Sequence, residues 1–137
     1  MQTQTLGLTL MFIAIAQYGV IPLLANLNST HASNPTWPLH ARFHVVTQAL
    51  TGAAIAAIAM YVLWAPGIAR STGVCLAVAL SACVIGAFFT SAAFRSLYGG
   101  ALSDSVGGIP QVRSIDLNAL NFGVALLSLI TGRWLLL

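Results

Sequence analysis

Four long apolar runs, separated by short polar or glycine- and proline-rich stretches, account for most of the chain. Each run reaches the about 20 residues that a helix needs to cross the hydrocarbon core of a bilayer. The pattern therefore predicts four membrane-spanning helices, over about 6–27, 38–64, 73–94 and 116–135.

The breaks between the runs carry helix start and stop signals. Pro38 suits the first turn of the second helix, and Pro66-Gly67 ends that helix. A loop with two Gly-Gly pairs follows the third run, from Arg95 to Ser114, and Asp116 opens the fourth. We therefore expect one membrane domain, an all-α, antiparallel, up-and-down bundle of four transmembrane helices.

Composition sharpens this prediction. Hydrophobic residues make up 58% of the 137 residues and charged residues 5%, with no lysine. A soluble domain carries far more surface charge, so lipid must surround most of this chain. The five arginines are too few and too dispersed for a nucleic-acid surface. We expect a multi-pass integral protein of the bacterial inner membrane, with lipid as a partner and nucleic acid excluded.

Small residues and cysteines lead to expectations about packing. Cys75 and Cys83 lie in one apolar run, about 12 Å apart along a helix, which is too far for an intrachain disulfide, and we expect both to be buried packing residues. Small residues at four-residue spacing let helices approach closely. These faces exceed what one four-helix core needs, so a homo-oligomer is expected. The two sets are Gly52 with Ala56, and Gly73 with Ala77 and Ser81.

Polar side chains concentrate at one end of the predicted bundle, where the first and third helices end and the second and fourth begin. On the second helix, four of them follow a spacing of i, i+4, i+8 and i+11, which forms a single stripe. Strongly polar groups at bilayer depth cost about 2.5 to 3.5 kcal/mol, so they persist where they pair or serve a site. The candidate site residues are His40, His44, Gln48 and Thr51 in this stripe, Arg95 after the third run, and Asp116, Asn118 and Asn121 in the fourth.

Each candidate also has a structural interpretation. His40 and His44 have the spacing at which two imidazoles share a metal ion, or at which one of them binds haem iron, but both also suit hydrogen bonding near a helix start. Arg95 and Asp116 would form either an interhelical ion pair or part of a pocket. The asparagines of the fourth run are equally suited to hydrogen bonds between helices.

Several catalytic patterns are missing from the sequence. There is no glycine-rich phosphate loop and no serine nucleophile elbow, and the only acids are Asp104 and Asp116. Hydrolysis and phosphoryl transfer are therefore not expected. The residues instead support Lewis-acid chemistry at a histidine-bound metal or haem, or proton transfer by histidine in an apolar pocket.

The segment WPLHARFHVVTQALTG resembles the styrene oxide isomerases, small four-helix membrane proteins that carry a haem b on a histidine near the start of the second helix. In that family a tryptophan and an Arg-x-His precede the second span, and here Trp37 and Arg42-Phe43-His44 match them. The order of the runs and the loop lengths are similar over most of the chain. Further matches are Ala69-Arg70 before the third run, and Phe88 and Phe89 near its end.

The resemblance implies that His44 ligates haem b, with the cofactor at a subunit interface. It further implies an epoxide-to-carbonyl rearrangement of a small apolar substrate, with the iron as Lewis acid. Two positions depart from the family. An asparagine after the ligand is replaced by Gln48, Leu50 or Thr51, and for a tyrosine on the third helix the nearest residues are Ala87 and Phe88, with Tyr98 displaced towards the loop.

Two other functions stay open on the same residues. His40 and His44, with Arg95 and Asp116, would support a haem-free isomerase or cyclase of an isoprenoid-like substrate by acid–base chemistry. A non-catalytic membrane subunit or small transporter would use the polar end to bind a partner or a proton.

Overall fold

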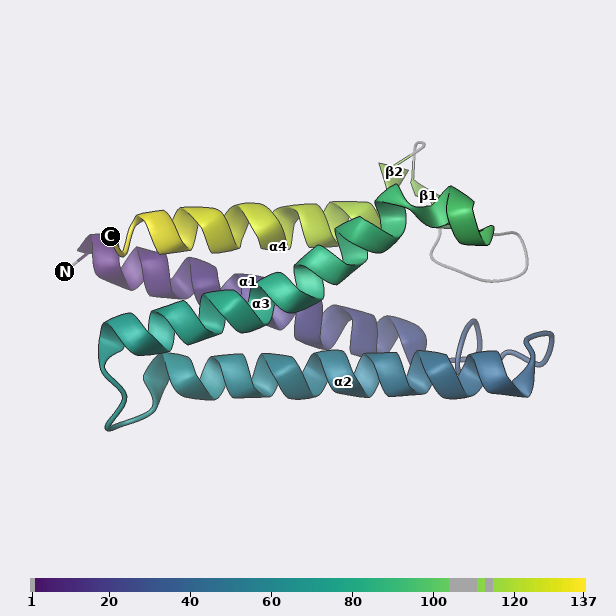
Figure 1. Cartoon of the computed structure of the whole chain (residues 1–137), viewed down its shortest axis with the longest axis horizontal. Coiled ribbons are helices and arrows are strands. Elements are labelled where there is room, and N and C mark those ends of the chain that lie inside the picture. The colour runs from purple at the N-terminus through teal and green to yellow at the C-terminus, as the bar shows by residue number, and fades with distance from the viewer. Residues whose placement is uncertain (1, 104–110, 113–114) are drawn as a thin grey trace.

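The computed structural model describes residues 2–103, 111–112 and 115–137, and within these ranges the chain folds into four α-helices (Figure 1). A 3₁₀ helix follows the third α-helix, and a short antiparallel hairpin leads into the fourth. The predicted all-α fold is therefore confirmed. The elements are α1 (Gln2–Asn26), α2 (Leu39–Trp64), α3 (Arg70–Ala93), η1 (Arg95–Tyr98), β1 (Gln111–Val112), β2 (Ile115–Asp116) and α4 (Leu117–Trp134).

Three of the helices, α1, α2 and α3, are long and apolar enough to cross a membrane. Their outward faces carry large apolar side chains such as Leu24 and Leu39, which are 70% and 79% exposed, as expected for surfaces in contact with lipid. The 18-residue helix α4 is not among them, because its two asparagines and Arg133 lower its mean hydropathy. The fourth span therefore stays a prediction.

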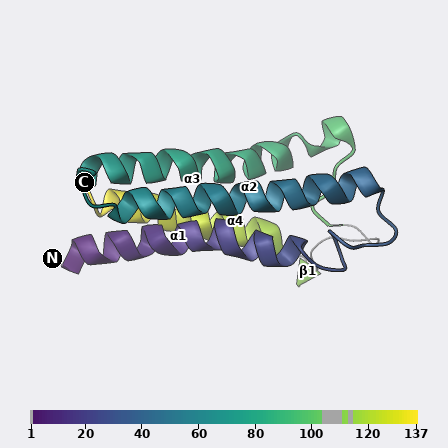
Figure 2. The same cartoon turned by 90° about the horizontal axis from the view of Figure 1, so that it is seen from below.

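The helices form a ring in which α1 packs against both α4 and α2, and α2 packs against α3. Figure 2 shows α1, α2 and α3 running side by side. The fourth contact of the ring, between α3 and α4, is the weakest of the four. In Figure 1, α3 runs diagonally from the end of α2 towards the beginning of α4. The two helices therefore approach each other mainly at one end.

Close helix contacts depend on residues without bulky side chains, as predicted for membrane helices. A Cβ on Gly132 of α4 would lie 2.7 Å from the carbonyl oxygen of Gly7 on α1, and a Cβ on Gly19 would collide with Ala56 of α2. The expected role of Gly52 is wrong, because a Cβ there would meet nothing within 4 Å. Its neighbour on the same face, Ala56, makes the contact instead.

The predicted small-residue set on α3 is confirmed. A Cβ on Gly73 would collide with the Val62 carbonyl of α2, and Ala77 and Ser81 are fully buried. The Ser81 hydroxyl donates to the Ala77 carbonyl at 2.7 Å and therefore accepts the hydroxyl of Tyr18 at 3.1 Å. This buried bond joins α1 to α3 across the middle of the bundle.

Candidate functional site

A pocket of about 670 Å³ lies between the four helices at the end where α2 and α4 begin. Its lining combines side-chain amides and hydroxyls with apolar and aromatic side chains, as binding sites for small molecules do. We call it the amide pocket. Its polar lining residues are Asn26, Gln48, Thr51, Ser91, Tyr98 and Asn118.

The packing of α3 explains why a pocket forms here. Phe88 of α3 stacks on Phe122 of α4 with ring centroids 4.1 Å apart and planes 6° apart, which closes the pocket on one side. Gly52 of α2 also lines the pocket, and its missing side chain leaves open space there, since a Cβ would meet nothing within 4 Å. The aromatic pair thus forms one wall and the small residue leaves room beside it.

Tyr98 belongs to this site, although its place in the sequence suggested a residue displaced towards the loop. The 3₁₀ helix η1 turns back at the end of α3, so that the Tyr98 hydroxyl donates to the Ser91 carbonyl at 2.8 Å. Both residues line the amide pocket. The Gly99-Gly100 pair that follows permits this turn, since Gly99 has a φ of +69°.

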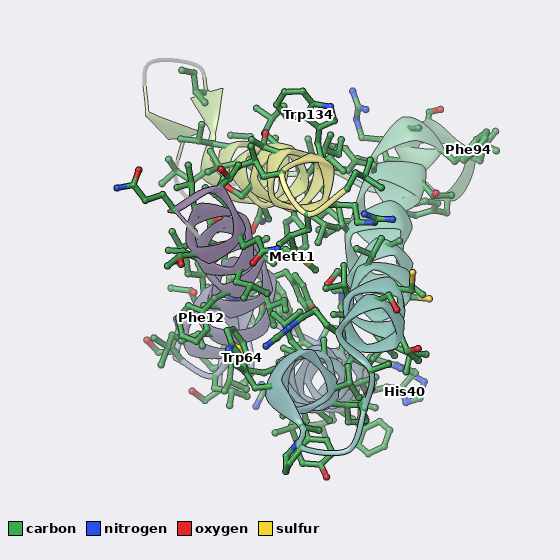
Figure 3. All side chains as sticks on the ribbon, turned by 90° about the vertical axis from the view of Figure 1, so that its left-hand side faces the viewer. Met11, Phe12, His40, Trp64, Phe94 and Trp134 are labelled. Atoms are coloured by element: carbon green, nitrogen blue, oxygen red, sulfur yellow. The ribbon has the colours of Figure 1, made fainter. Side chains whose placement is uncertain are left out.

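The predicted histidine stripe divides into two parts. The Nε2 atoms of His40 and His44 lie 2.9 Å apart, and both side chains are exposed. Figure 3 shows His40 on the outside of the bundle. Gln48 and Thr51 line the amide pocket, whereas neither histidine does. One helical turn, about 6 Å along the axis, separates His44 from Gln48.

The histidine pair alone is an incomplete metal site. Two nitrogens at about 2.1 Å from one tetrahedral metal ion would lie roughly 3.4 Å apart, so the pair needs only a small opening to share a metal. Among residues 2–103, 111–112 and 115–137, however, no three histidine, cysteine or acidic side chains come together to hold a metal ion. Further ligands would have to come from outside this set.

Arg95 and Asp116 do not form the ion pair considered from the sequence. The Asp116 carboxylate caps α4 by accepting the Ala119 N–H at 2.9 Å, and Arg95 donates to the Ala92 carbonyl at 2.6 Å. Within the described part of the chain neither residue has an ionic partner, and neither lines the amide pocket. Asp116 stabilises the start of α4, where a carboxylate also meets the positive end of the helix dipole.

Asn118 and Asn121 have different surroundings. Asn118 lines the amide pocket, while the Asn121 side chain donates to the Gln17 carbonyl of α1 at 3.5 Å, which is a long and weak bond. The side-chain oxygens of Gln17 and Asn121 are buried without a donor among the described residues. Asn121 therefore contacts a neighbouring helix, as the structural interpretation expected.

The cysteines are not buried packing residues, and this expectation is wrong. Both are free and exposed. Cys83 lines the amide pocket, and Cys75 lines a second pocket of about 700 Å³ at the opposite end of the bundle. We call the second the arginine pocket, because Arg70 and Arg133 both line it. Its sequence signal was weak, since the two arginines are 63 residues apart.

Sequence reasoning did not single out His31, which lies in the loop before α2. Its side chain is buried, hydrogen-bonds through Nδ1 to the Thr30 hydroxyl at 2.7 Å and contacts Trp37 edge-on at 5.3 Å. Burial lowers the pKa of His31. A sequence signal for an ordered loop around His31 is the repeated Asn-x-Thr pattern. The side chains of Asn28 and Asn34 accept hydrogen bonds from the threonine two residues later in each case.

The fold and the pockets place this chain in a class of protein. It is an all-helical protein with long apolar helices that suit a membrane, and its polar side chains lie at the ends of the bundle. The chain belongs to the Family of unknown function (DUF6640), whose model matches residues 10–115. No curated protein and no solved structure matches the chain. The family match covers α1 from residue 10 onward and all of α2 and α3, and it ends just before α4.

Proposed function

We propose that this chain is a multi-pass protein of the bacterial inner membrane, with α4 as its fourth span, and that it is an isomerase-type enzyme. Its substrate is a small apolar molecule that carries an oxygen atom and binds in the amide pocket. The observation that carries this proposal is the convergence of amides and hydroxyls from all four helical segments beside the Phe88–Phe122 stack.

The polar groups of the amide pocket suit a neutral oxygen. The amides of Gln48 and Asn118 each offer two N–H donors, and the hydroxyl of Thr51 offers one more. None of these three side chains carries a charge. A neutral ligand can therefore bind them without leaving a charge unpaired at bilayer depth. An apolar substrate would reach the pocket from the membrane, into which it partitions, and its oxygen would accept the amide protons.

Within this class of isomerase, the reaction that we propose is the rearrangement of an epoxide to a carbonyl compound. One C–O bond of the epoxide breaks at the carbon that better bears positive charge, and a hydrogen moves there with its electron pair from the neighbouring carbon. The oxygen completes a carbonyl, so substrate and product are isomers. A ring face that the Phe88–Phe122 stack leaves free would stabilise the cationic carbon, and the apolar lining of the pocket would exclude water.

If the protein binds haem, His44 of the histidine pair would hold it. His44 offers its Nε2 once the His40 ring turns aside, and the exposure of both side chains leaves room for that rotation. A second copy of the chain would supply the rest of the enclosing wall, in line with the homo-oligomer expected from the sequence. When bound, haem would supply a Lewis acid for the substrate oxygen.

The bond between the two imidazoles also supports the haem-free alternative. One histidine of the pair donates to the other, so the two can pass a proton between them and act as acid and base on an isoprenoid-like substrate. Among the described residues neither Arg95 nor Asp116 bonds to either histidine, so this version rests on the histidine pair alone.

Product formation from styrene oxide by the purified chain in proteoliposomes tests the function. We expect the aldehyde isomer by gas chromatography, with at least about tenfold less product for Asn118→Leu, equivalent to about 1.4 kcal/mol of lost transition-state binding. Asn121→Leu is the matched control, since Asn121 lies outside the pocket, and it should retain activity. No product from the wild-type chain, or equal loss in both variants, would contradict the proposal.

An absorbance spectrum of the protein purified from membranes separates the two chemistries. The haem version predicts a Soret band that is lost in His44→Ala and retained in His40→Ala. Activity without a Soret band would support the haem-free version. A band that survives His44→Ala unchanged would show that the ligand is a different residue.

A further inference from the structure

The arginine pocket has no role in the proposed function. It lies between the beginnings of α1 and α3 and the end of α4, where the diagonal course of α3 takes it away from α4 (Figure 1). Its volume is about 700 Å³, and its lining contains two arginines from different helices. It therefore opens at the face of the bundle opposite to the amide pocket.

The two guanidinium groups are largely free to bind a ligand. Arg70 donates one bond, at 2.8 Å, to the Leu63 carbonyl at the end of α2, which leaves most of its five donors unused. The Arg133 side chain makes no hydrogen bond or ion pair to any described residue. Asp116, the one acid in the described ranges, lies at the other end of α4, about 25 Å away along the helix.

The start of α3 adds positive potential to this pocket. Arg70 and Ser71, the first two residues of the helix, both line it. The N-cap residue, Ala69, has no side chain that can satisfy the N–H groups of the first turn. The positive end of the helix dipole therefore points towards the same space as the two arginines, which favours an anion there.

Apolar side chains complete the lining. Leu8 of α1, Val74 of α3 and Leu136 after α4 border the pocket beside the charged groups. We propose that the arginine pocket binds an anionic lipid, with a phosphate oxygen of the headgroup on Arg70 and Arg133 and an acyl chain along this apolar wall. Guanidinium groups suit phosphate because their parallel N–H groups match two of its oxygens.

Native mass spectrometry of the detergent-purified full chain tests this site with phosphatidylglycerol as the added lipid and phosphatidylcholine as the neutral comparison. We expect phosphatidylglycerol adducts to be retained at least tenfold better than phosphatidylcholine adducts, and this preference to disappear in Arg70→Gln/Arg133→Gln. Arg42→Gln, which removes an arginine at the other end, is the control and should retain it. Equal retention of the two lipids by the wild-type chain would overturn the proposal.

The single variant Arg133→Gln tests the site with less risk of a folding defect, since the Arg133 side chain has no hydrogen bond to a described residue to lose. It should keep the elution volume of the wild-type chain and lose most of the lipid preference. Full retention of the preference in this variant would overturn the assignment of Arg133. Displacement of phosphatidylglycerol by millimolar inorganic phosphate would confirm the anion site and identify free phosphate as a second source of the ligand.

The two cysteines give an independent readout in liposomes. In Cys83→Ser the remaining thiol, Cys75, reports the arginine pocket, and in Cys75→Ser the remaining thiol, Cys83, reports the amide pocket. An uncharged maleimide should label Cys75 at least threefold more slowly in phosphatidylglycerol than in phosphatidylcholine liposomes, with Cys83 unaffected. Equal slowing of both thiols would contradict a site at the arginine end.

Discussion

The two ends of this bundle hold pockets of similar size and opposite chemistry. At the amide end, neutral donors and an aromatic wall surround the space, while at the arginine end two guanidinium groups and a helix start do. At the arginine end α3 lies against α2, where Gly73 meets the Val62 carbonyl, and at the amide end it lies against α4, where Phe88 stacks on Phe122. The comparison teaches that one diagonal helix, packed on a different neighbour at each end, leaves a pocket at both ends, and that the lining side chains suit one pocket to a neutral oxygen and the other to an anion.

The largest expected effect comes from the aromatic wall of the amide end. Phe122→Ala removes the ring that stacks on Phe88 and should lower the free energy of unfolding by about 3 to 5 kcal/mol. Since this stack joins α3 to α4, maleimide labelling of Cys83 should accelerate while that of Cys75 stays unchanged. The control is Phe12→Ala, because Phe12 is 46% exposed. Equal acceleration at both cysteines would mean that the two ends are not independent.

The arginine end is held by a close backbone contact instead. Gly73→Val places a side chain against the Val62 carbonyl and should cost about 1 to 3 kcal/mol, measured by thermal unfolding in detergent. Labelling of Cys75 should change more than that of Cys83. Gly86→Val, on the same helix, faces open space and should be near neutral. A neutral Gly73→Val would contradict the contact.

A smaller effect is expected at the middle of the bundle. Tyr18→Phe removes the buried hydrogen bond to Ser81 and should cost about 1 kcal/mol. Because this bond lies between the two pockets, any change in labelling should affect both cysteines alike. Tyr61→Phe alters a tyrosine that is 67% exposed and serves as the control. If Tyr18→Phe instead raised the free energy of unfolding, the hydroxyls of Tyr18 and Ser81 would not form a stabilising hydrogen bond.

The smallest effect concerns pH and the loop before α2. Burial lowers the pKa of His31 in the folded state, so the unfolded chain, with a histidine pKa of about 6.5, binds the proton more readily. The free energy of unfolding therefore has its full His31 contribution above about pH 6.5. It decreases as the pH falls from there through the lower pKa of folded His31. His31→Gln should flatten this dependence in thermal unfolding at pH 5 and pH 8. An unchanged slope would assign the effect to another group.

Much of the fold was predictable from the sequence, because the position of each helix depends on the residue pattern within one segment of the chain. Apolar runs, Pro38 and Pro66-Gly67 located the helices to within about a turn, and the spacing of Gly73, Ala77 and Ser81 predicted a contact face. These features depend on the periodicity and chemistry of one segment, which the sequence displays directly.

The site was predictable only in part, because its shape depends on how helices diverge. The sequence placed Gln48, Thr51 and Asn118 at the polar end, and the structure brings them to one pocket. It did not reveal that Arg95 and Asp116 bond to their own neighbouring backbone, or that both cysteines face pockets. The bonds of Arg95 and Asp116 are local, since each joins backbone three residues away, whereas the diagonal course of α3 determines which residues line the pockets. The resemblance to styrene oxide isomerases stays a prediction.

The central claim is that the amide pocket binds a small apolar molecule through its oxygen atom, and protection of Cys83 tests it most directly. In the Cys75→Ser chain, saturating 2-phenylethanol, an unreactive oxygen-bearing compound, should slow maleimide labelling of Cys83 at least threefold. The same compound should leave Cys75 unaffected in the Cys83→Ser chain, and Asn118→Leu should abolish the protection. Equal protection of both cysteines, or undiminished protection in Asn118→Leu, would contradict the account.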